Sequence, residues 1–246
     1  MVKGGLKDMV KKSSMRLTPA PARGGPPCRA ALCVVDFGSG GEPMKLYDSN
    51  RAPSPRRVRI FLAEKGIKVD LVPVDLAKFE QFSGPFTALN PLQRVPVLVL
   101  DDGTVISETV AISRYFEALQ PEPNLLGRDP REIALVEMWN RRIEFNFYWP
   151  VSQAFRHLHP AMAEREKPQV ADWGEANKPK VVEFARLLDG ELAKRSHVAG
   201  DRFTVADITA FVTVDFMKPA KIELPAELAN VRRWHAAIAA RPSASA

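Results

Sequence analysis

The spacing of apolar residues changes along the chain, and the first change marks where a folded unit begins. Met44–Asp48 and Lys68–Pro73 alternate apolar and polar residues, which predicts two strands. Between them, Ser54–Gly66 places Val58 and Phe61 on one face of a helix. The order strand, helix, strand is typical of the beginning of an α/β unit.

This first helix has clear signals at both ends. Ser54 is a suitable N-cap, Pro55 suits the first helical position because no N–H is needed there, and Gly66 suits the C-cap. We therefore expect the helix to begin at Ser54. Capping the helix could be the only role of Ser54.

A short helix and a hairpin complete the unit. The short helix is expected around Lys78–Leu89. Pro96–Leu100 and Thr104–Ile106 flank Asp102-Gly103, a dipeptide that favours an antiparallel hairpin. A further helix is expected from Glu108 to Leu119.

Helical spacing continues after Pro121-Glu122-Pro123, which predicts a linker. Asp129-Pro130, a cap followed by a first-turn proline, predicts the start of a long helix. Pro150 is expected to bend this helix. Two apolar runs at helical spacing follow: Ile133, Val136, Trp139, Ile143, Phe147, Val151 and Phe155, and then Val181, Ala185, Leu188 and Leu192. Thr204 and Asp207 predict a capping box at the start of a later helix. The second unit is therefore all helical.

The positive charge of the chain is concentrated at its N-terminus. The net charge is +6, but residues 1–43 carry seven Lys/Arg against three acidic residues, so the rest contributes only +2. That remainder has no basic excess of the kind that favours nucleic-acid binding. No apolar run reaches the roughly 18 residues of a membrane span. We expect neither nucleic acid nor membrane as a partner.

The N-terminal segment has the composition of a disordered extension. Residues 1–43 hold seven of the fourteen glycines and five prolines, without a sustained apolar period. We expect no folded role for it, because Met44 stands directly before the first strand. Both cysteines, Cys28 and Cys33, lie in this segment, so the remainder has no disulfide and no cysteine nucleophile. This cysteine usage fits a cytoplasmic location.

Three segments resemble motifs of the glutathione S-transferase family, over roughly residues 44–246. Asn90–Leu98 is similar to the loop and cis-proline strand of that family, and Ile106–Ile112 is similar to its turn with an acidic residue followed by a hydroxyl. Val198–Asp207 is similar to its C-terminal capping segment. The order and spacing of the three carry the resemblance.

The resemblance implies a fold: an α/β thioredoxin-like N-terminal domain followed by an all-α helical C-terminal domain. The boundaries we expect are residues 1–43 for a disordered extension, 44–121 for the thioredoxin-like glutathione-binding domain, 122–130 for the linker and 131–246 for the helical domain.

The same resemblance implies how glutathione is held. The backbone of Val95, before a cis Pro96, would pair with the cysteinyl part of the peptide as an added strand would. Glu108 and Thr109, at the start of a helix, would hold the ammonium and carboxylate of the γ-glutamyl end. Gln81 would reach the glycyl carboxylate. Each role has an alternative. Pro96 could be a trans proline that starts a strand, Ser107 or Thr109 could simply cap the helix, and Gln81 could be solvated at the surface.

The expected chemistry is attack of the glutathione thiolate on an electrophile. Family members usually place Tyr, Ser or Cys near the start of the first helix, whereas this chain has Ala52 in the serine position and Ser54 near the cysteine position. Ser49 is the only other nearby hydroxyl. Ser54, Ser49 or a bound water could therefore activate the thiol.

This departure resembles an atypical fungal and bacterial branch that lacks the usual residue. There, the dipole of the first helix and an ordered water are thought to stabilise the thiolate, with the help of a serine and a histidine. Ser152 matches that serine, but Arg156 occupies the place of the histidine, with His157 beside it. Ser54 and Ser152 are the candidate catalytic residues.

Three arginines in the first helix offer a second sign of function. Arg56, Arg57 and Arg59 oppose the helix dipole, which favours either an anion site or a solvated basic face. The electrophile pocket is expected from aromatic and polar residues of the helical domain: Tyr148, Phe155, His157 and Phe211. His157 and His159 lack further metal ligands nearby, so no metal is expected.

The implied function is a homodimeric detoxification enzyme that conjugates glutathione, its co-substrate, to small hydrophobic electrophiles. Two alternatives stay open. A non-catalytic carrier or protein-interaction module would fit the alanine at position 52. A glutathione-dependent peroxidase or reductase needs no cysteine if glutathione supplies both thiols.

Overall fold

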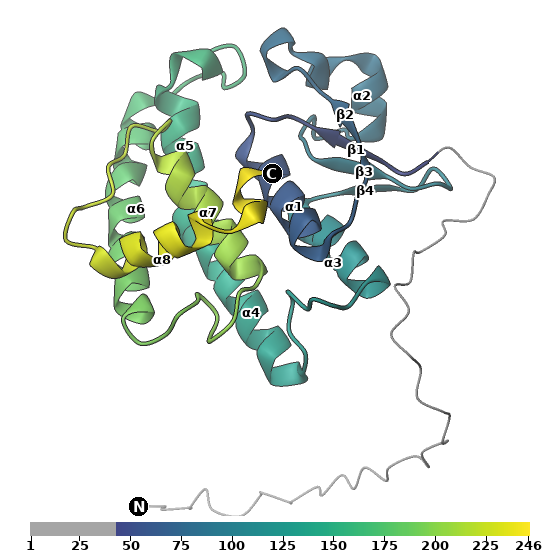
Figure 1. Ribbon diagram of the computed structural model, residues 1–246. Helices are drawn as coiled ribbons and strands as arrows, with labels where there is room; N and C mark the ends of the chain where they lie inside the picture. The colour runs from purple at the N-terminus through teal and green to yellow at the C-terminus, as the bar shows by residue number, and fades with distance from the viewer. Residues whose placement is uncertain (1–42) are drawn as a thin grey trace, which may run out of the picture. The chain divides into compact units, whose positions relative to one another are not determined.

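A computed structural model describes residues 43–246, and Figure 1 shows how their helices and strands are arranged. The expected extension lies outside the described residues, apart from Pro43. The N-terminal domain comprises β1 (Lys45–Asp48), α1 (Pro53–Lys65), β2 (Asp70–Pro73), α2 (Gly84–Leu89), β3 (Val97–Val99), β4 (Val105–Ser107) and α3 (Thr109–Leu119). The C-terminal domain comprises α4 (Pro130–Ile143), α5 (Trp149–Leu158), α6 (Ala171–Leu192), α7 (Val205–Met217) and α8 (Ala229–Ala239). This is the thioredoxin-like plus all-helical fold that the sequence predicts.

The N-terminal domain is built on a mixed sheet with strand order β2-β1-β3-β4. β1 and β2 are parallel, whereas β3 runs antiparallel to β1 and to β4. Leu46 and Leu98 are paired across β1 and β3 and are fully buried in the core that includes residues of α1 and α3. Val97, one position earlier, faces a smaller cluster with Phe86 of α2. Alternation along β3 therefore assigns the two faces of the sheet to different helices.

The predicted local signals are largely confirmed. Gly66 takes the left-handed conformation as the C-cap of α1, and Gly103 has φ +83° in the predicted hairpin. The Val95-Pro96 peptide bond is cis. Thr204 and Asp207 form the predicted capping box of α7.

Two element boundaries differ from the prediction. α1 begins at Pro53, with Ala52 as an N-cap that offers no side-chain hydrogen bond, so Ser54 is not the cap. The helix expected around Lys78–Leu89 is instead two 3₁₀ turns followed by α2. Phe79 separates the turns with φ +60°, because the Asp75 carboxylate binds the N–H groups of the first turn and draws the chain into a local loop.

The long helix of the C-terminal domain is interrupted. Between α4 and α5, Glu144–Tyr148 widens into a π-helical turn, and Pro150 lies in the first turn of α5. Because a proline ring crowds the carbonyl four residues earlier, the irregularity precedes Pro150. The middle of the predicted apolar stripe, from Val136 to Val151, is buried, whereas Ile133 is exposed.

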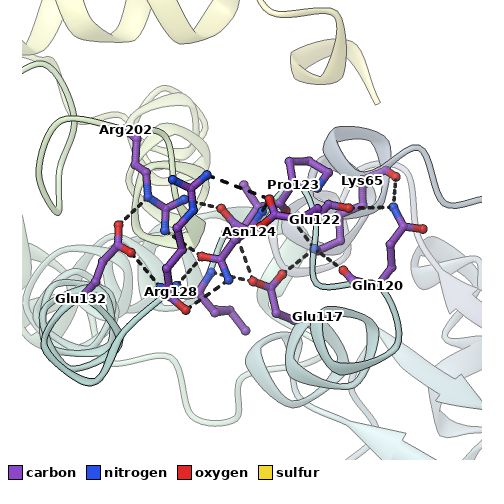
Figure 2. Close-up of polar contacts among 12 residues, drawn as sticks. Lys65, Glu117, Gln120, Glu122, Pro123, Asn124, Arg128, Glu132 and Arg202 are labelled. Atoms are coloured by element: carbon purple, nitrogen blue, oxygen red, sulfur yellow. Dashed lines mark hydrogen bonds and ion pairs between the residues drawn. The ribbon is translucent and has the colours of Figure 1, made fainter. Parts of the chain in front are cut away.

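A buried ammonium joins the end of α1 to the segment between the two domains (Figure 2). The Lys65 Nζ donates to the carbonyls of Gln120 and Pro123 at 2.7 and 2.9 Å and pairs with the Glu117 carboxylate at 2.6 Å. The other oxygen of Glu117 accepts the N–H groups of Leu125 and Leu126. Lys65 therefore satisfies carbonyls that the linker would otherwise bury without partners.

The same network continues into the helical domain. Arg202 donates to the Glu132 carboxylate and to the carbonyl and side chain of Asn124 (Figure 2). Through these contacts the linker is bonded to both domains. No helix among the described residues is both long and apolar enough to cross a membrane.

Candidate functional site

A cleft of about 1240 Å³ lies where the start of α1 faces the helical domain. One wall is formed by residues 48–54, by parts of the segment 71–82 and by residues 92–95. The other wall comes from α5, the segment after it and the end of α7. In Figure 1, α5 lies on one side of this region and α2 with β2 on the other.

Two hydroxyls from different domains meet at the start of α1. The Ser54 Oγ lies 2.7 Å from the Tyr148 hydroxyl oxygen, so the two groups share a hydrogen bond, and both residues line the cleft. Ser54 therefore makes a tertiary contact in the first turn of α1 instead of capping the helix.

The Tyr148 phenol is held in its neutral form. Burial raises the pKa of Tyr148, and the hydrogen bond with Ser54 and the nearby Arg57 guanidinium offset only part of that effect. The phenol consequently keeps its proton at neutral pH and can donate it to Ser54. In that arrangement the proton of Ser54 is available to a group in the cleft.

The three arginines of α1 do not form an anion site. Arg56 pairs with Asp215 at 2.6 Å, Arg57 with Glu144 at 2.5 Å and Arg59 with Asp48 at 2.5 Å. Each guanidinium is therefore matched by a carboxylate from another element. Neither the anion site nor the solvated basic face is therefore observed, and the arginines instead fix α1 to its surroundings.

Two of the residues expected to hold glutathione line the same cleft. Val95 lies two residues before β3 and is joined to Pro96 by the cis bond. Gln81 is only 3% exposed, and its Oε1 is buried without a hydrogen-bond partner among the described residues. A buried amide oxygen without a donor on a cleft wall is the kind of group that a hydrogen-bond donor of a ligand satisfies.

The other two stand at the start of α3, outside the residues that line the cleft. Glu108 is exposed with φ +72°, a conformation that side chains other than glycine rarely adopt, and its carboxylate does not cap the helix. Thr109 is buried, and its carbonyl accepts the Ser113 hydroxyl proton at 2.8 Å. The N-cap residue of α3 is Glu108 and no side chain caps the helix, so the alternative of plain capping by Ser107 or Thr109 is not observed.

The helical-domain wall contains some of the expected pocket residues. Tyr148, Ser152 and Phe155 line it, and the Phe155 ring lies 5.1 Å from that of Phe216. Tyr148 and Ser152 are four residues apart, so they share one face of the helix. Met162 and Arg165 also line this wall, but they lie in a segment whose sequence carries no periodic signal.

Two expected pocket residues, His157 and Phe211, lie elsewhere. His157 accepts the Val170 N–H at 3.0 Å, because it is two residues beyond Phe155 and so points to a different side of α5. Phe211 is buried between Arg56 and His235. It precedes Phe216 by five residues, which turns it away from the cleft.

The histidines near the end of α5 are occupied in local contacts. The His159 Nδ1 accepts the Ala161 N–H at 3.1 Å, as His157 does for Val170. Within residues 43–246 no three His, Cys, Asp or Glu side chains come together as a metal site.

Comparison with known proteins identifies both domains. Residues 52–119 match the family model described as glutathione S-transferase, N-terminal domain, and residues 139–242 match the one described as glutathione S-transferase, C-terminal domain. The C-terminal match includes the whole helical-domain wall of the cleft, and the N-terminal match includes the opposite wall from Ala52 onward.

Whole-chain relatives agree. Glutathione S-transferase 2 of Saccharomyces cerevisiae is 39% identical over 212 residues, which cover 83% of this chain and 91% of that protein. The crystal structure of Gtt2 from the same yeast superposes with a TM-score of 0.78 at 39% identity, over 81% of this chain and 97% of the other. A glutathione S-transferase domain-containing protein of Marinobacter aquaeolei superposes with a TM-score of 0.79 at 41% identity, over 81% and 98% of the two chains. The chain therefore belongs to the glutathione S-transferase family.

Proposed function

We propose that this protein conjugates the thiolate of glutathione to small hydrophobic electrophiles, and that the start of α1 stabilises the thiolate. The observation that carries this proposal is the Ser54 hydroxyl, which faces the cleft in the first turn of α1 and is bonded to Tyr148. Family membership supports the general activity, and the cleft geometry supports the roles given to these residues.

The energy that such a site must supply is modest. A free thiol has a pKa of about 8.5, and lowering it by one or two units requires about 1.4 kcal/mol per unit. A helix N-terminus contributes roughly 0.3–1 kcal/mol, and up to about 2 where it is partly buried. A hydrogen bond to a charged group contributes about 1.5–3 kcal/mol. The two effects together are sufficient.

Ser54 and Ser152 have distinct roles in this proposal. Ser54 donates to the sulfur, while the neutral Tyr148 phenol donates to Ser54 and so fixes the direction of its proton. Ser152, one helical turn beyond Tyr148 on the same wall, holds a water that faces the same sulfur. Neither role requires a hydroxyl at Ala52.

The remaining residues would orient the two substrates. The Val95 backbone, beside Pro96, pairs with the cysteinyl unit, and the NH₂ group of the Gln81 amide donates to the glycyl carboxylate. Glu108 and Thr109 hold the γ-glutamyl end. The reacting carbon lies against Phe155, Met162 and Phe216, where the sulfur forms a bond to carbon and a leaving group departs with its electron pair.

The first test is an ultraviolet titration of glutathione bound to the protein, which follows the thiolate band against pH. We expect the band to appear at least one pH unit below that of free glutathione. Binding without a shift would favour a carrier over an enzyme, and absence of binding would refute the proposal. Glu108→Ala should weaken the affinity for glutathione; an unchanged affinity would reject its assigned role.

We further propose a cytoplasmic homodimer that serves detoxification. Phe145 and Trp149, 65% and 54% exposed along the α4–α5 segment, support an apolar contact surface. Sedimentation equilibrium should give twice the 27.3 kDa mass of the chain. A monomer at micromolar concentration would contradict this part of the proposal.

A further inference from the structure

The helical-domain wall of the cleft carries positive charge that the proposed chemistry does not use. Arg156 of α5 and Arg165, in the segment between α5 and α6, both line this wall. Among the described residues that line it from the helical domain, none is acidic. The apolar side chains of Phe155, Met162 and Phe216 line the same wall.

The two arginines differ in how their charge is compensated. Arg156 forms an ion pair with Glu166, which is not a cleft residue. Arg165 has no ion pair with any residue of the described part of the chain: it donates to the Leu76 carbonyl and lies 5.4 Å from the centre of the Phe79 ring. Its Nε is buried and meets no acceptor within residues 43–246.

The carboxylate across the cleft that acts on Arg165, that of Asp75, already has other partners. Asp75 accepts the N–H groups of Ala77 and Lys78 at 2.9 and 3.3 Å and lies 3.6 Å from the Lys78 ammonium. Burial, together with the neighbouring charge of Arg156, lowers the pKa of Arg165 in spite of Asp75. The guanidinium stays charged at neutral pH, so the wall retains a partly buried positive charge that has no ion pair among the described residues.

We infer that the preferred electrophiles carry a carboxylate, which Arg165 binds while the apolar reactive part lies against Phe155, Met162 and Phe216. This inference rests on the proposed function and names the substrate class for it. A planar guanidinium suits a carboxylate because two of its N–H groups can donate in parallel. The charge of Arg156, on the same wall, adds a longer-range attraction for the carboxylate of the electrophile.

The carboxylate takes no part in the reaction itself. With an α,β-unsaturated ketone, the thiolate sulfur forms a bond to the β-carbon and the carbon–carbon π electrons move toward the carbonyl. The resulting enolate takes a proton from water at the α-carbon. Atoms and charge balance without any oxidant or reductant, and the carboxylate only positions the substrate.

The experiment compares one electrophile in two charge states. The full chain is assayed at saturating glutathione with ethacrynic acid, an aryl enone that carries a carboxylate, and with its neutral methyl ester. The measured quantity is the ratio of kcat/KM for the acid to that for the ester. Because the intrinsic reactivities of the two compounds enter every ratio equally, a change between variants reports on the protein.

In the Arg165→Gln variant we expect this ratio to fall about tenfold, as the loss of a charge-assisted hydrogen bond in a partly exposed site predicts. Arg165→Lys should retain part of the preference because it keeps the charge. Arg186→Gln, on the exposed face of α6, is the matched control and should leave the ratio unchanged. Raising the salt concentration to 1 M should lower the ratio of the wild-type protein.

Two results would overturn the inference and leave the proposed function standing. One is an unchanged ratio in Arg165→Gln when the variant melts at the wild-type temperature. The other, from separate assays in which the glutathione concentration is varied, is an equal rise in the KM for glutathione with both electrophiles, because Arg165 would then bind a carboxylate of glutathione. Failure of the proposed function has a different signature: the wild-type protein would conjugate neither compound, and the inference would fall with it.

Discussion

At the scale of single residues, the central feature is a hydrogen bond between side chains 94 positions apart. Ser54 and Tyr148 meet at 2.7 Å, and burial keeps the phenol protonated. A serine hydroxyl that accepts one proton has its own proton free to donate, so the pair can direct a hydrogen bond into the cleft.

Removal of either hydroxyl should therefore change the acid limb of the plot of kcat/KM against pH. We expect Ser54→Ala to lower kcat/KM about tenfold and to move this limb up by about one pH unit, because a hydrogen bond to the thiolate is lost. Tyr148→Phe should have a smaller effect in the same direction, about threefold. Tyr115→Phe, on α3, is the matched control. A lower rate without a shifted profile would mean that Ser54 acts only through packing.

At the scale of elements, α1 is fixed at both ends by distant segments. The C-terminal turn, Pro242–Ser245, follows Arg241, which forms a two-point ion pair with Glu64 of α1 at 2.7 Å. The Ser243 hydroxyl donates to the same carboxylate. At the other end, Arg56 binds the Ala244 carbonyl at 3.0 Å. The C-terminus thus contributes to the position of the helix that starts in the cleft.

This anchor predicts a pH dependence of stability. Burial alone would raise the pKa of Glu64, but hydrogen bonds from Arg241 and Ser243 outweigh it and lower the pKa below its ordinary value. The stabilisation is therefore complete above the unfolded pKa of about 4.3 and is lost as the pH falls through the lower folded value.

Glu64→Gln should accordingly destabilise the protein by about 1 kcal/mol at pH 7, allowing for solvent screening, and by progressively less below pH 4. Urea unfolding at several pH values measures this difference. Glu227→Gln, which removes an exposed ion pair with Arg186, should have little effect at any pH. A difference that stays constant down to pH 3 would contradict the assigned cause.

The buried ammonium of Lys65 should contribute more to the free energy of unfolding than Glu64 does. Lys65→Met leaves the Glu117 carboxylate and two linker carbonyls without their partner, so we expect a loss of about 3 kcal/mol in the free energy of unfolding. Lys194→Met, on the surface, should change it by less than about 0.5 kcal/mol. A Lys65→Met, Glu117→Leu double variant should lose less than the sum of the single losses, and strict additivity would argue against a shared network.

At the scale of the whole molecule, both domains contribute to the cleft. Every described residue that lines it lies between Asp48 and Pro219. A variant that starts at Met44 should therefore conjugate glutathione within twofold of the full chain and melt within about 2 °C of it. Calorimetry and steady-state kinetics test this, and a weaker affinity for glutathione would assign part of the site to residues 1–43.

Interactions between near neighbours in sequence were predictable from the sequence alone. The Thr204/Asp207 capping box, the Gly66 C-cap and the Asp102-Gly103 hairpin each depend on groups a few residues apart, and each is observed. The order of elements followed from the same local patterns, whereas the fold was implied by the resemblance of three segments to the glutathione S-transferase family.

Only the tertiary structure decided which side chains meet. The partner of Ser54, the carboxylates that pair with the arginines of α1 and the positions of His157 and Phe211 all depend on contacts between elements far apart in sequence. Local spacing specifies a face of a helix, but it does not specify what packs against that face. For the same reason, the charge of Arg165 acquires meaning only in the folded protein, where a segment without periodic signal forms one wall of the cleft.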